Sequence, residues 1–102
     1  AGGSARAVAV ALAGEGAHVT VHARNTAQAE AVARLVGGEV GAFPPGDGSW
    51  DLLVNCTPIG MHPRVDQSPV QSSSLTRGVV YDLIYNPPVT RLLRDAATAG
   101  CD

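Results

Sequence analysis

The alternation of strand-like and helix-like segments limits the fold of this chain more than any other feature of its sequence. Residues 17–23 alternate with period two and are rich in β-branched side chains, which predicts a strand. Helix-like segments stand on both sides of it. Strands that alternate with helices of about ten residues are typical of a parallel sheet with right-handed crossovers. The sequence therefore predicts an α/β fold.

Two helices can be placed in the first third of the chain. The first spans 5–13 and ends at Gly14-Glu15-Gly16. Its apolar residues run almost all round the helix, so we expect it to be buried on more than one side. The second begins after Asn25 or Thr26, either of which can cap it, and continues to about residue 36.

The rest of the chain continues the same alternation. The expected elements are a weak strand over 39–43, a turn over 44–48, a buried strand over 51–55, a loop over 57–74, a strand over 79–83, and a helix that starts at Asn86-Pro87-Pro88 and closes at Gly100.

Length and composition restrict the class of protein. With 102 residues the chain can hold one domain, residues 1–102, but not a two-domain enzyme. A net charge of −2 provides no basic field for nucleic acid, and no apolar run approaches the roughly 18 residues of a membrane span. The amino end does not resemble a signal peptide. We therefore expect a cytoplasmic protein whose partner is a small molecule.

Two residue types restrict the chemistry. Cys56 and Cys101 stand alone rather than in a metal-type or redox-type pair, so we expect both to be reduced and predict no metal site. All 7 basic residues are arginines, and the chain has no lysine.

The start of the chain could bind an anion. In Gly2-Gly3-Ser4, glycines allow close backbone approach, and free amides with the helix dipole favour a pyrophosphate, although such a pair can also be only a tight turn. In dinucleotide-binding units the residue that reads the adenosine ribose lies about 20 residues further on. Arg24 occupies that place and favours the 2′-phosphate of NADP, the alternative being a solvated surface arginine.

Four segments in a fixed order make the assignment more specific. They are Ala1-Gly2-Gly3-Ser4-Ala5-Arg6-Ala7, Ala23-Arg24-Asn25, Asn55-Cys56-Thr57-Pro58-Ile59-Gly60-Met61 and Asp82-Leu83-Ile84-Tyr85-Asn86-Pro87-Pro88-Val89-Thr90-Arg91-Leu92-Leu93. The chain thereby resembles shikimate dehydrogenases, which carry G-A-G-G-x-x-R-A, N-R-T, N-A-T-P-x-G-M and D-x-x-Y-x-P-x-x-T-x-L-L in this order.

The resemblance implies a fold and a site. The fold would be a Rossmann-type doubly wound parallel sheet, truncated so that its first strand and last helix lie outside the chain. The cofactor would be NADP. The implied contacts are Gly2, Gly3 and Ser4 with the diphosphate, Arg24 with the 2′-phosphate and Asn25 in the same segment, Thr57 on the adenosine side, Leu83 at the nicotinamide end, and Tyr85 with the shikimate. Asn55 and Asp82 are expected to bind backbone groups at strand ends rather than ligand.

The resemblance also implies a reaction, the reversible reduction of 3-dehydroshikimate to shikimate by NADPH on the way to chorismate and the aromatic amino acids. In the family a lysine and an aspartate of an amino-terminal domain handle the proton, so we expect no catalytic residue in this lysine-free chain. Two departures, Ala23 and Gln28, replace polar or basic residues of the family and weaken the expected preference for NADP.

Three alternatives remain open from the sequence. One is a quinate or quinate/shikimate dehydrogenase, which shares these motifs. Another is a non-catalytic, shikimate dehydrogenase-like sensing module. A glutamyl-tRNA reductase-like domain is a third, which the segment 82–93 argues against. Because the first strand of a doubly wound sheet is central, we expect the isolated 102 residues to fold poorly.

Overall fold

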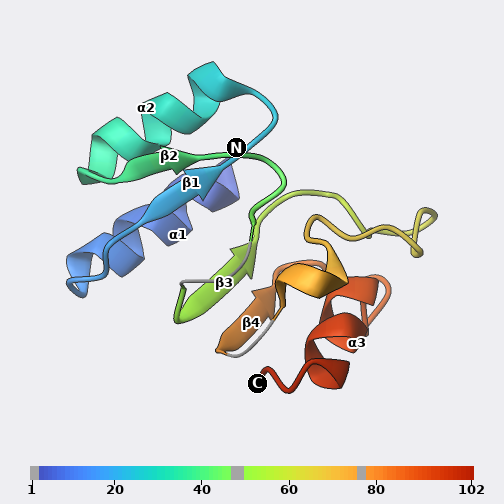
Figure 1. Ribbon diagram of the computed structural model, residues 1–102. Helices are drawn as coiled ribbons and strands as arrows, with labels where there is room; N and C mark the ends of the chain where they lie inside the picture. Colours follow the sequence, from blue (N-terminus) through green and yellow to red (C-terminus); the bar gives the residue numbers. More distant parts are fainter. Residues whose placement is uncertain (1–2, 47–49, 76–77) are drawn as a thin grey trace. The chain divides into compact units, whose positions relative to one another are not determined.

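A computed structural model describes residues 3–46, 50–75 and 78–102 of the chain. They fall into two units, Ala1–Pro44 and Pro45–Asp102, each built around a pair of parallel strands (Figure 1). The predicted α/β class with parallel strands is therefore confirmed.

The first unit contains α1 (Gly3–Gly14), β1 (Thr20–His22), α2 (Thr26–Val36) and β2 (Glu39–Gly41). Strand β1 pairs with β2 in parallel, with a register that sets Thr20 opposite Glu39 and His22 opposite Gly41. Helix α2 packs on both strands and buries its Ala29, Val32 and Ala33 there. The helix thus supplies the apolar cover of this strand pair.

Both ends of α2 lie where the sequence predicts them. The Asn25 side chain accepts a hydrogen bond from the Gln28 backbone N–H at 3.1 Å, which satisfies one of the free donors of the first turn. At the other end Gly37 adopts a left-handed conformation with φ 66°, and its N–H bonds back to the last turn. Local sequence chemistry alone accounts for these limits.

Helix α1 differs from expectation. Ala9 is its buried residue, at 5% exposure, whereas Val10 is 49% exposed, so the prediction of burial on more than one side is wrong for the described chain. The helix packs against α2, and no strand among the described residues lies against it. Ala7, Val10 and Ala11 of this helix therefore stay exposed.

The second unit contains β3 (Leu52–Asn55), the short 3₁₀ helix η1 (Ser72–Ser74), β4 (Val79–Asp82) and α3 (Arg91–Thr98). Strands β3 and β4 pair in parallel, with Asn55 opposite Asp82 at their carboxyl ends. Helix α3 packs on β4 and η1. The core of this unit consists of Val70, Leu75, Val80, Leu92 and Ala96.

The last residue described, Asp102, lies beside β4. Its N–H donates to the Gly78 carbonyl and its own carbonyl accepts from the Val80 N–H, both at 2.9 Å. These two bonds follow the pattern of a parallel pair. Asp102 therefore occupies the edge of β4 that β3 does not.

Two predicted boundaries need correction. The last helix begins at Arg91 rather than at Asn86-Pro87-Pro88, because the Thr90 hydroxyl accepts from the Leu93 N–H at 3.3 Å and caps the helix there. The strand predicted over 17–23 is shorter, with only Thr20–His22 paired to β2. The segment 57–74 is mostly loop, as predicted, and η1 is its one described helical turn.

Gly38 lies between α2 and β2, where the backbone is closely packed, and a substitution there tests the packing of the first unit. A Cβ at Gly38 would run into the carbonyl oxygen of Val19, a backbone atom that the register of β1 and β2 holds in place. We expect Gly38→Ala to lower the free energy of unfolding of the complete protein by about 2 kcal/mol. Gly14→Ala is the matched control, since its Cβ would meet no atom within 4 Å. Equal unfolding midpoints in urea for the two variants would contradict this packing.

Candidate functional site

The residues predicted to form a site fall in both units, and each unit presents its own part. In the first unit they lie at the start of α1 and directly after β1; in the second they follow β3 and β4. This placement agrees with the general rule that α/β proteins bind ligands beyond the carboxyl ends of their strands.

The amino end of α1 has the properties of an anion site. Gly2 lies outside the described residues. Gly3 is the first residue of the helix, is exposed, and has no atom within 4 Å of where a Cβ would stand. Ser4 is exposed too, and the first turn carries no acidic residue. The first N–H groups of a helix have no partner within it and carry the positive end of its dipole.

An exposed arginine follows β1. The guanidinium carbon of Arg24 lies 5.4 Å from the centre of the Phe43 ring, within the range of a cation–π contact. The neighbouring Asn25 uses its side-chain oxygen to cap α2. Of the two residues predicted in this segment, Arg24 therefore presents a charge to solvent while Asn25 has a structural task.

In the second unit a buried polar network joins the ends of β3, β4 and α3. The Asp82 carboxylate accepts from the Asn55 amide at 3.2 Å and the Ile84 N–H at 3.0 Å on one oxygen. Its other oxygen accepts from the Thr90 hydroxyl at 2.8 Å. Asn55 is 3% exposed and Thr90 is 1% exposed. The predicted structural role of Asp82 at its strand end is confirmed.

The same network shapes the turn after β3. The Asn55 side-chain oxygen accepts from both the N–H and the hydroxyl of Thr57, at 3.0 and 2.6 Å. The Thr57 hydroxyl in turn accepts from the Ile59 N–H at 3.2 Å, and the Asn55 amide donates to the Ile59 carbonyl at 3.3 Å. The Thr57 hydroxyl is therefore engaged within the turn.

Exposed apolar side chains follow the two strands. Leu83 is 37% exposed, and its backbone N–H donates to the Asn55 carbonyl at 3.1 Å, which holds it beside the turn after β3. Tyr85 is 88% exposed and Met61 is 43% exposed. Leu83 and Tyr85 follow β4 in the chain and Met61 follows β3, so these exposed side chains are candidates for contact with a ligand.

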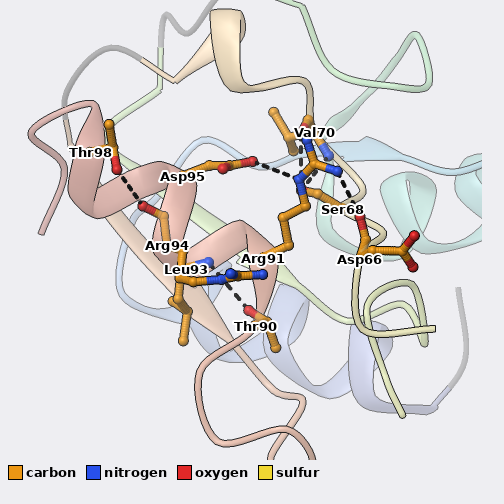
Figure 2. Close-up of polar contacts among 9 residues, drawn as sticks. All are labelled: Asp66, Ser68, Val70, Thr90, Arg91, Leu93, Arg94, Asp95 and Thr98. Carbon is orange, nitrogen blue, oxygen red and sulfur yellow. Dashed lines mark hydrogen bonds and ion pairs between the residues drawn. The ribbon is translucent and has the colours of Figure 1, made fainter. Parts of the chain in front are cut away.

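Arg91 fixes the long segment that connects β3 to η1. Its guanidinium donates to the Asp66 carbonyl at 2.8 Å and pairs with Asp95 one helical turn further along α3, at 3.5 Å (Figure 2). Within that segment the Ser68 hydroxyl donates to the Val70 carbonyl at 2.9 Å. The arginine therefore ties an otherwise irregular segment to the start of α3.

Cys56 is half-buried directly after β3. Burial and, secondly, the negative charge of Asp82 raise the pKa of its thiol above the ordinary value. Both described cysteines are free, as the sequence predicts.

Sequence reasoning missed three residues of these arrangements. Phe43 lies 19 positions from the arginine it supports (43 − 24), and no local pattern connects them. Thr90 and Arg91 were quoted only as members of a motif. Thr90, directly before the amphipathic segment of α3, was the available signal, since threonine is a favoured N-cap residue.

Comparison with known proteins gives one consistent result, although no protein-family model matches the chain. The chain is 40% identical to the NADP(+) shikimate dehydrogenase of Methanosarcina mazei over 98% of its own length and 40% of that protein. It is 43% identical to the Halobacterium salinarum enzyme of the same name over 98% of its length and 39% of that protein. The chain thus spans about two fifths of the relatives it matches.

Solved structures give the same result. Shikimate 5-dehydrogenase from Thermus thermophilus, in complex with NADP(H) and shikimate, superposes with a TM-score of 0.87 at 33% identity, covering 99% of this chain and 39% of that one. A shikimate dehydrogenase in complex with NADP+ gives 0.87 at 34% identity, covering 100% and 39%. The predicted resemblance to shikimate dehydrogenases is confirmed.

The described residues contain neither a membrane-spanning helix nor a metal-binding cluster. None of the helices there has the length and apolar character needed to cross a membrane. In the same ranges, no three His, Cys, Asp or Glu side chains are grouped so that they could hold a metal ion.

Substitutions in the network of Asn55, Asp82 and Thr90 test what stabilises the second unit. Asp82→Asn keeps the shape of the side chain but turns an amide N–H₂ toward the Thr90 hydroxyl, which loses its acceptor. We expect a loss of about 1–3 kcal/mol in the free energy of unfolding of the complete protein. Thr90→Val is expected to give a loss of the same order, and Thr90→Ser to retain most of the stability.

Asp51→Asn is the matched control, because Asp51 is an exposed carboxylate at the other end of β3. Chemical denaturation of the four variants measures the differences. A loss for Asp51→Asn as large as that for Asp82→Asn would show that charge, not the hydrogen-bonded network, determines the stability.

Proposed function

We propose that this chain is the NADP-binding part of a shikimate dehydrogenase, an enzyme that reversibly reduces 3-dehydroshikimate to shikimate with NADPH in the biosynthesis of chorismate and aromatic amino acids. The observation that carries the proposal is about 40% identity over nearly the whole chain to enzymes of that name. An arginine after β1, with no acidic residue at positions 23–25, supports NADP as the cofactor.

Part of the proposal is that the sheet is a Rossmann-type doubly wound sheet with a further strand before the glycine-rich turn and a further helix after Asp102. In such sheets the strand before the turn packs against the first helix. Two observations within the first unit support it. Val10 of α1 is 49% exposed, and among the described residues β1 has β2 as its single partner strand.

The residues present fit the cofactor. The open space at Gly3 would admit a diphosphate against the backbone N–H groups of Gly3 and Ser4. Arg24 would bind the 2′-phosphate with the edge of its guanidinium, and Asn25 would keep its segment in place as the cap of α2. Thr57 would line the adenosine side through its methyl group. NADPH supplies the hydride, and these residues bind and orient it.

The second unit would contribute to the reacting end. Leu83, 37% exposed, would pack against the nicotinamide and help exclude water. Tyr85, 88% exposed, has a phenol free to reach the hydroxyl or carboxylate groups of shikimate. The proton would be handled by a lysine and an aspartate of an amino-terminal domain, since this chain has no lysine. A cytoplasmic location is part of the same proposal.

One observation favours a second candidate. The chain also superposes on a shikimate 5-dehydrogenase-like protein with a TM-score of 0.85 at 27% identity. A related activity, such as quinate oxidation, or a non-catalytic sensing role is therefore the alternative, with the departures at Ala23 and Gln28 as its signal in the sequence.

Turnover by the complete protein distinguishes these functions. We expect it to oxidise NADPH in the presence of 3-dehydroshikimate, and to use shikimate with NADP⁺ in the reverse direction more efficiently than quinate with NAD⁺. A clear preference for quinate with NAD⁺ would establish the quinate enzyme instead. Binding of shikimate without turnover would establish the sensing role.

The start of α1 provides a test of the cofactor site. Gly3→Ala fills a space in which the protein has no atom within 4 Å, and alanine favours a helix over glycine. We expect the unfolding free energy to stay the same or rise by up to about 1 kcal/mol, while NADP⁺ affinity falls about tenfold or more because the methyl group displaces the diphosphate. Titration calorimetry measures the affinity, with Gly14→Ala at the far end of the helix as control. Unchanged affinity would place the diphosphate elsewhere.

A further inference from the structure

The proposed function assigns no role to the contact between Arg24 and Phe43. We propose that Phe43 is a positioning residue that holds the Arg24 guanidinium for the 2′-phosphate, and that it thereby sets the preference for NADP over NAD. This inference rests on the proposed function. It concerns the first unit alone, because both residues belong to it.

The position of Phe43 is fixed by the ends of β1 and β2. His22, the last residue of β1, lies opposite Gly41, the last residue of β2. Its ring occupies the space where a Cβ on Gly41 would stand, so glycine is what allows the imidazole to lie there. From this place His22 Nδ1 donates to the Ala42 carbonyl at 2.6 Å. The bond anchors the chain at the residue directly before Phe43.

The same strand end positions the arginine. Arg24 comes two residues after His22 and directly before Asn25, which caps α2. Its backbone is therefore held on both sides, while its long side chain is exposed. In the part of the chain that the structure describes, Arg24 takes part in no salt bridge, and the Phe43 ring is the contact that orders its guanidinium.

A ring contact suits a phosphate-binding arginine. The guanidinium carbon lies over the Phe43 ring, and the contact is between a cation and a π-face rather than a conventional hydrogen bond to an acceptor atom. The contact therefore leaves the five N–H donors of the guanidinium available to a phosphate. It also reduces the rotamer freedom that a long, exposed side chain loses when it binds. Phe43 thus lowers the cost of the Arg24–phosphate contact without competing for it.

This support matters more here because of the departures noted in the sequence. Ala23 offers no side-chain amide, and position 28 is a glutamine rather than a basic residue. Discrimination between the cofactors then depends on one arginine. Because the 2′-phosphate is present in NADP and absent from NAD, positioning of that arginine affects the NADP complex selectively.

The test is the ratio of kcat/KM for NADPH to kcat/KM for NADH in the complete protein. We expect Phe43→Leu to lower this ratio roughly two- to fivefold, the effect of one exposed cation–π contact. Phe43→Trp is expected to keep or raise it, since tryptophan is the best aromatic partner for a cation. Leu35→Ala, which removes an exposed apolar side chain of α2, is the matched control and is expected to leave the ratio unchanged.

A double-mutant cycle separates positioning from a general structural effect. In an Arg24→Ala background, Phe43→Leu is expected to cause no further change in the ratio, because its partner is gone. An undiminished effect in that background would overturn the inference, as would an unchanged ratio for Phe43→Leu in the parent protein. Should Phe43→Leu fold poorly, the comparison of Phe43→Trp with the parent decides: a ratio below that of the parent overturns the inference. Absence of turnover with either nucleotide in the parent protein would overturn the proposed function together with it.

Discussion

The Asp82 carboxylate is the group on which the second unit depends. It accepts hydrogen bonds from β3 through Asn55, from its own strand end through Ile84, and from the cap of α3 through Thr90. An uncompensated carboxylate in such a place would be costly, and three donors satisfy it. Through Asn55 the same network shapes the turn after β3. One charge therefore fixes the strand ends, a turn and a helix start together.

The first unit joins its strand ends without a carboxylate. Its two strand ends are joined by the His22 imidazole, which lies over Gly41 and binds the Ala42 carbonyl. The residues that follow these ends, Arg24 and Phe43, are then brought into a cation–π contact. In both units, rigid strand ends hold the residues proposed to meet the ligand, which is how α/β proteins place loops for binding on a stable scaffold.

Part of the structure could be predicted from interactions between residues that are close in the sequence. Asn25 and Gly37 mark the ends of α2 because a cap and a left-handed glycine act within a few residues. The start of α3 was placed too early, at the prolines after Asn86, because the cap is Thr90, whose hydroxyl also binds a carboxylate eight residues away. Sequence patterns could not show the exposure of Val10 in α1, which depends on what lies against the helix. The Phe43–Arg24 contact depends on strand register, so the sequence patterns could not predict it either.

The central claim is that the end of β1, with Arg24 over Phe43, holds the 2′-phosphate of NADP. A crystal structure of the complete protein with NADP⁺ tests it most directly. We expect the 2′-phosphate within hydrogen-bond distance of the Arg24 guanidinium, with that group still over the Phe43 ring and the diphosphate at the N–H groups of Gly3 and Ser4. A nucleotide whose 2′-phosphate is bound by other residues, with Arg24 turned away from Phe43 into solvent, would contradict it.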